Sequence, residues 1–227
     1  MTPRSTACWI CLAGLLAACH STHGPTMAPQ RPAAAGIDDG AAMLADAENA
    51  RQAIARHALL AAANDLNRGL GEADQLAGAA SSVFPEDAPK PARNASTKRM
   101  SRFSAQVRLL SADTELENGD VADADRDLAE IEAGVPASVL PATFPLLRAE
   151  ESLDVAEGAV AANQASGLPV QLAIAQQALR TYGGNPHRAD ASALAAEIAR
   201  ALARPDATNR IPPDQLADWA TRVSGWI

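Results

Sequence analysis

The clearest structural signal lies in residues 107–131, which read VRLLSADTELENGDVADADRDLAEI. Apolar residues recur every three or four positions on both sides of Asn118-Gly119-Asp120, which is the spacing of one helix face. The stripe before the glycine comprises Met100, Phe103, Val107, Leu110 and Leu116, and the stripe after it comprises Val121, Ala124, Leu128 and Ile131. Because only two or three residues connect the stripes, the segment predicts an antiparallel helical hairpin.

The same helical spacing extends outward in both directions. A first helix is predicted from Met43 to near Gly69, with a shorter one over 72–80. Further helices are predicted over 146–167, 168–182 and 191–201, with a last one from about Asp214. The sequence thus predicts an all-α antiparallel bundle of helical hairpins, with about 6–7 helices and no substantial β-sheet.

Composition supports this fold and excludes some functions. The chain has 227 residues and is 48% hydrophobic but only 3% aromatic, and alanine, the best helix former, is abundant. Strand-favouring residues are scarce, which argues against an all-β fold. The net charge of -8 would repel a phosphate backbone, so no nucleic-acid partner is expected.

The N-terminus carries an export signal. A short region with Arg4 precedes an apolar stretch from Ala7 to Ala18, too short for a stable membrane span. Leu16-Ala17-Ala18-Cys19 resembles the lipobox of bacterial lipoproteins. This resemblance implies that Cys19 becomes the first mature residue and carries acyl chains, which would hold the protein on a membrane.

Domain boundaries and location follow from this signal. We expect a signal peptide over 1–18, a lipidated N-terminus and Pro/Ala-rich tether over 19–40, and one helical domain over 41–227 with a mobile loop near 84–96. His20 follows Cys19 in place of the aspartate that retains many such proteins at the inner membrane. We therefore expect anchoring at the outer membrane, facing the periplasm.

The usual catalytic motifs are absent from the sequence, so we expect no enzyme, no cofactor and no metal site. Glu150, Asp154 and Glu157 share a helix face, where they could bind a hard cation or act as an acid/base pair. The simpler interpretation is a solvated polar face. His187, in a first helical turn, is expected to face solvent.

Three residues are candidates for ligand binding. Trp219 and Trp226 are seven positions apart and share a helix face, where they either close one end of the core or line a groove. His57 lies beside the first apolar stripe as a partly buried ring, a pH-responsive group or a ligand contact. The basic residues Lys98, Arg99, Arg102 and Arg108 are interpreted as a solvated surface.

The order of features from Val107 to Tyr182 resembles the YfdX family of bacterial envelope proteins. The resemblance rests on a helix ending at Gly119, an apolar Leu140-Pro141 passage and a helix leading to Gly167, and it covers at most half of the chain. It implies a helical, non-catalytic periplasmic protein, linked to stress or virulence, that binds small molecules in an oligomer.

Two hypotheses for function follow. The first is a lipid-anchored periplasmic binding or interaction protein without catalytic activity, with a small amphiphilic ligand in a stress-related role and a homo-oligomeric state. The second is a tetratricopeptide-like scaffold for envelope proteins, because Gly119 and Gly184 both precede small residues at helix crossings.

Overall fold

The computed structural model describes residues 38–76, 81, 83–84, 100–204 and 211–227. Within these residues the fold is all-α, as the sequence predicts, and contains no strand. The α-helices are α1 (Asp39–Ala55), α2 (Leu59–Gln75), α3 (Arg102–Asn118), α4 (Val121–Gly134), α5 (Phe144–Ala161), α6 (Leu168–Thr181), α7 (Arg188–Leu202) and α9 (Pro213–Ser224). Short 3-10 turns lie at Ala137–Val139 and Ala165–Gly167. Cys19, residues 20–37 of the predicted tether and residues 85–96 of the predicted loop lie outside the described residues. The predicted tether boundary at residue 40 is wrong, because Asp38 caps α1 and Gly40 is already buried in that helix.

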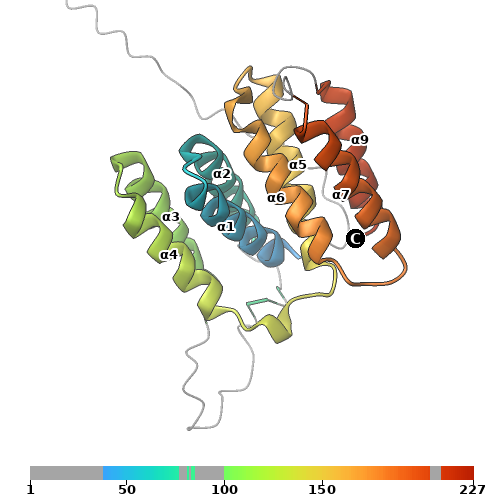
Figure 1. The fold of residues 1–227 in the computed structure, drawn as a ribbon. Coiled ribbons are helices and arrows are strands. Elements are labelled where there is room, and N and C mark those ends of the chain that lie inside the picture. Colours follow the sequence, from blue (N-terminus) through green and yellow to red (C-terminus); the bar gives the residue numbers. More distant parts are fainter. Residues whose placement is uncertain (1–37, 77–80, 82, 85–99, 205–210) are drawn as a thin grey trace, which may run out of the picture.

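The helices form two halves that pack side by side. Figure 1 shows the α3–α4 hairpin at one edge, then α1 and α2, then α5 and α6, with α7 and α9 at the other edge. One apolar core, here the first core, joins α1 to α4 and receives Phe144, Leu147 and Ile174 from the other half. The second core joins α5, α6, α7 and α9 around Trp219. The two halves meet where α1 and α2 pack on α5 and α6.

The predicted single helix from Met43 to Gly69 is wrong, because the chain reverses at residues 56–58. The Arg56 and His57 amides donate to the Ala53 and Ile54 carbonyls, and His57 adopts a left-handed φ of 58°. No glycine or proline marks this turn, so the apolar spacing of α1 continues into α2 in the sequence. Residues 72–75 of the shorter helix predicted over 72–80 are instead the end of α2, and residues 77–80 lie outside the described residues.

The hairpin between α3 and α4 is confirmed. Gly119 has a φ of 84°, a conformation that side chains disfavour, and the Asp120 amide donates to the Glu115 carbonyl to close the helix end. The observed N-cap of α3 is Ser101, whose hydroxyl accepts a hydrogen bond from the Ser104 amide. At the other end, Met100 packs so closely on Gly134 that a Cβ there would lie 2.6 Å from the Met100 Cβ.

The predicted inward face of α3 is largely wrong. Phe103, Val107 and Leu110 are 70%, 48% and 51% exposed. The residues that α3 buries against α2 and α4 are Ala105, Leu109, Ala112 and Leu116. The two alanines let α3 approach its neighbours closely, and this turns the larger side chains outward. We call the exposed set Phe103, Val107 and Leu110 the outer stripe.

Candidate functional site

The two tryptophans occupy different environments. Trp219 is fully buried in the second core, and its indole N–H donates to Glu197 Oε1 at 2.9 Å. Glu197 also accepts from Arg222 at 3.0 Å. The bond from Trp219, assisted by Arg222, lowers the pKa of Glu197. Trp219 therefore packs inside the bundle rather than presenting its ring to solvent.

Trp226 is partly buried against the second core, and His187 is partly buried beside it. Trp226 stacks on His187 with ring centroids 5.8 Å apart, and the His187 Nδ1 lies 3.4 Å from Asp190 Oδ2. His187 is thus partly covered by Trp226, whereas the sequence predicts that it faces solvent. His57 lies exposed in the turn between α1 and α2, so its predicted partial burial is wrong. No hydrogen bond or ring contact described in the structure joins His57 to either tryptophan.

Charged side chains are buried between the two halves, where the sequence predicts none. They come from α1 and α2 on one side and from α5 and α6 on the other. We call this set the polar seam: Asp46, Asn49, Asp65, Arg68, Arg148, Glu151, Asp154 and Gln171. Each helix contributes part of its inner face to the seam, so the seam connects the halves.

Arg68 is the central cation of the seam. Its Nε donates to Glu151, its Nη2 donates to Asp154 Oδ2 at 2.9 Å, and its Nε lies 4.0 Å from Asp46 Oδ2. Burial lowers the pKa of Arg68, but the surrounding carboxylates outweigh this effect and the net pKa is raised. Arg68 therefore remains protonated and ties α2 to α5 through charge-assisted hydrogen bonds.

Asp46 and Asp65 are fully buried beside Arg68. Neither carboxylate oxygen of Asp46 accepts a hydrogen bond from the described residues, whereas Asp65 Oδ2 accepts one from Gln171 Nε2 at 2.9 Å. Burial raises the pKa of Asp46 well above its usual value, with Glu151 adding to the effect. Burial also raises the pKa of Asp65, to about 8. Asp65 is thus poised to hold a proton near neutral pH.

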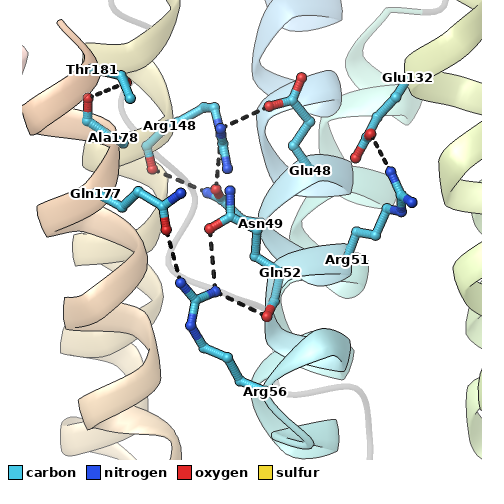
Figure 2. Close-up of polar contacts among 10 residues, drawn as sticks. All are labelled: Glu48, Asn49, Arg51, Gln52, Arg56, Glu132, Arg148, Gln177, Ala178 and Thr181. Atoms are coloured by element: carbon cyan, nitrogen blue, oxygen red, sulfur yellow. Dashed lines mark hydrogen bonds and ion pairs between the residues drawn. The ribbon is translucent and has the colours of Figure 1, made fainter.

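Figure 2 shows the polar contacts around Arg148, where the seam reaches the partly exposed Glu48. Arg148 Nη1 pairs with Glu48 Oε2 at 2.9 Å, and its backbone carbonyl accepts from Asn49 Nδ2 at 3.1 Å. Burial lowers the pKa of Arg148 and raises that of Glu48. Nearby, Arg56 Nη2 donates to Gln177 Oε1 at 2.9 Å and joins α6 to the end of α1.

The predicted carboxylate face divides between solvent and interior. Glu150 is buried, Asp154 is held by Arg68, and Glu157 is partly exposed, so the prediction of one solvated face is wrong for Glu150. Within the described residues, no group of three acidic, histidine or cysteine side chains is arranged to hold a metal ion. The chemistry that the seam itself offers is proton uptake and release.

The basic residues near the start of α3 bind groups of the protein itself. Arg102 donates to the Leu76 carbonyl, and Arg108 pairs with Asp127 at 2.8 Å and with Glu130. Lys98 and Arg99 lie outside the described residues. The part of this cluster that can be seen therefore links helices.

The outer stripe is the largest run of exposed apolar side chains on one described helix. Phe103, Val107 and Leu110 follow one another at steps of four and three, and exposed Thr114 continues the series. This spacing is typical of a helix face that packs on another helix. The sequence shows the stripe but does not show that it faces outward, because a second stripe with the same spacing, Ala105, Leu109, Ala112 and Leu116, runs along the opposite face of the helix.

The sequence does not predict the polar seam, and the reason differs from that for the outer stripe. Its members are charged, and charged residues on an amphipathic helix are expected to face solvent. Their partners lie about 80 positions away in the chain, as in the pair of Arg68 and Glu151. The weak amphipathic pattern of α1, which is buried almost all round, is the one available signal.

Comparison with known proteins identifies no relative of this chain. None of the described helices combines the length and the apolar character needed to cross a membrane. No protein-family model, no curated protein and no solved structure matches the chain.

Proposed function

We propose that this protein is a lipid-anchored helical interaction protein of the bacterial cell envelope, without catalytic activity. The observation that carries the proposal is the outer stripe, which exposes three large apolar side chains on one helix at the edge of the bundle. Exposed apolar residues that form one patch mark interaction surfaces more often than scattered ones do. A stripe along one helix suits a partner helix better than it suits a small amphiphile, which binds in a cavity.

The anchor is proposed from the sequence. Leu16-Ala17-Ala18-Cys19 supplies the lipobox, and the proline-rich segment from His20 to Ile37 supplies a tether. A flexible coil of about 20 residues has a root-mean-square reach of roughly 25 Å. This tether would hold the helical domain close to, but clear of, the headgroups of the outer membrane.

The partners and the burial of the acids in the polar seam support a non-catalytic role. Glu151 and Asp154 are occupied by Arg68, and Asp65 is bound by Gln171. A general acid or base must reach the proton of a bound substrate within hydrogen-bond distance. Glu151, Asp154 and Asp65 are instead bound to their own neighbours, and Asp46 is fully buried between packed helices.

Metabolic labelling tests the anchor. Cells expressing the full chain receive a clickable palmitate analogue, and the same experiment is done with Cys19→Ser. We expect label and membrane recovery for the wild type and at least a tenfold loss of label for the variant. Equal labelling of both chains, or recovery of the unlabelled wild type in the cytosol with its leader uncleaved, would contradict the anchor.

Site-specific photocrosslinking tests the interaction surface. A photoreactive amino acid replaces Val107 in one chain and Ala122, an exposed residue of α4, in the control chain. We expect a discrete protein adduct from position 107 and none from position 122. Adducts of lipid or small molecules alone at position 107 would favour the amphiphile-binding alternative instead.

A further inference from the structure

We propose that the outer stripe binds the same stripe of a second copy of this chain, with the two α3 helices antiparallel about a twofold axis. This inference rests on the proposed function, because it names the partner of the surface described there. It is argued from three features of α3: the spacing of the stripe, the charges along the helix and the area available.

The spacing and surroundings of the stripe fit a helix partner. The outer stripe advances by four, three and four residues from Phe103 to Thr114. This spacing allows each side chain to fit between residues of a facing helix. Ser104, Gln106 and Ser111 flank most of the outer stripe and are uncharged, while Asp113 and Glu117 flank only its C-terminal end. A second helix can therefore approach without removing many charges from water, as interface cores require.

A twofold axis makes one stripe sufficient for both partners. In an antiparallel pair centred between Val107 and Leu110, Val107 of each copy faces Leu110 of the other. Phe103 then faces Thr114, so the largest side chain meets one of the smallest. Such an interface is self-complementary and closes after two copies.

The charges along α3 favour the antiparallel direction. Asp113 and Glu117 lie one turn apart at the C-terminal end, and neither forms an ion pair with a described residue. Burial, with the nearby Glu117 adding to it, raises the pKa of Asp113. An antiparallel copy brings the positive N-terminal end of its α3, with Arg102, toward these acids. A parallel copy would instead bring the acidic ends together.

The available area predicts a weak dimer that anchoring would strengthen. α3 has 17 residues, hence a length of about 25 Å, and one such helix pair buries less than the roughly 1,600 Å² of a standard interface. We therefore expect weak association in free solution. Confinement to a membrane by the proposed tether raises the effective concentration of the second copy and allows the same contact to form.

Disulfide crosslinking in isolated membranes tests the pairing and its direction. Two differently tagged full-length chains are co-expressed, one with Phe103→Cys and the other with Thr114→Cys, and an oxidant is added. We expect a mixed disulfide at least tenfold above the background of the wild-type cysteines, and little homodimer when Phe103→Cys is expressed alone. A Phe103→Cys homodimer exceeding the mixed product would overturn the antiparallel arrangement.

A second pair of variants ties the crosslink to the stripe. Leu110→Asp, added to both tagged chains, places two charges at the twofold axis and should reduce the mixed disulfide at least tenfold. Ala122→Asp on α4 should leave the yield unchanged, and circular dichroism checks that all chains stay helical. An unchanged yield with Leu110→Asp, no mixed disulfide, or attachment only to another polypeptide would overturn the proposal.

The crosslink and the lipid label are independent readouts. Label at Cys19 without the mixed disulfide would remove the dimer and keep the anchored interaction protein. The mixed disulfide without label would keep the dimer and remove the anchor.

Discussion

The polar seam and the second core are both closed to solvent, but different forces hold them together. In the second core, Trp219 and its aliphatic neighbours are stabilised by the removal of apolar surface from water, which does not depend on pH. In the seam, Asp46 and Asp65 are equally buried, and their contribution depends on whether they carry a proton. The contact between the two halves should therefore respond to pH, while the C-terminal half should not.

Replacing the central cation of the seam should have the largest effect. Arg68→Met keeps much of the side-chain volume but leaves Glu151 and Asp154 without their cation. Breaking a buried ion pair costs about 3–5 kcal/mol, and we expect a loss of that size at pH 8. At pH 5 the loss should be smaller, because buried carboxylates without a cation take up protons. Urea unfolding at the two pH values measures both losses.

Trp219→Ala is the matched change in the second core. Removing a buried tryptophan costs about 3–5 kcal/mol, and here we expect nearly the same loss at pH 5 and pH 8. If the loss for Arg68→Met were equally independent of pH, the distinction between the seam and the core would be wrong.

The stability of the wild-type protein should itself fall as pH rises. The pKa of Asp65 is about 8 in the folded protein and about 4 in an unfolded chain. Between these values the folded state holds a proton that the unfolded state has lost, so each pH unit lowers the free energy of unfolding by up to about 1.4 kcal/mol per such group. Stability should thus be greater at pH 5 than at pH 8. A flat profile in denaturant titrations over this range would contradict the raised pKa values.

Removing one of the buried acids should stabilise the protein at high pH. Asp65→Asn has nearly the same shape, and its amide oxygen can still accept the Gln171 hydrogen bond. Because an uncompensated buried charge is costly, we expect a gain of about 1–3 kcal/mol at pH 8 and little change at pH 5. The exposed control Asp218→Asn should change stability by less than about 0.5 kcal/mol at either pH. Destabilisation by Asp65→Asn at pH 8 would show that the charged form is the one the fold prefers.

The sequence shows the hairpins more clearly than the seam, and the reason is the range of the signals. Gly119 marks a turn by its own conformation, so the α3–α4 hairpin is predicted from local residues. The reversal at His57 has no such marker and was missed. The inward side of α3 depends on how closely Ala105 and Ala112 let α2 and α4 approach, and this is a property of the packed structure.

The polar seam depends most strongly on contacts between residues that are far apart in the sequence. Asp46, Asp65 and Arg68 look like solvent-facing positions until α5 is placed against them. The outer stripe is intermediate, because its spacing can be read from the sequence and its exposure cannot. The sequence therefore predicts the turn that Gly119 marks and part of the helix faces, but it predicts neither the unmarked turn at His57 nor the contacts between the halves.

The smallest effect should come from Glu197, whose pKa is lowered, in contrast to the raised pKa values of the seam acids Asp46 and Asp65. Glu197 accepts hydrogen bonds from Trp219 and Arg222, which lowers its pKa, so its contribution is present above the unfolded value and is lost as pH falls through the folded one. Because the carboxylate is partly exposed and screened by solvent, Glu197→Gln should cost only about 0.5 kcal/mol at pH 7 and almost nothing near pH 3. Paired denaturant titrations of variant and wild type measure this difference. A loss that grows on acidification would mean that Glu197 titrates like the acids of the polar seam. The contrast between the two regions would then rest on Arg68 and its carboxylates alone.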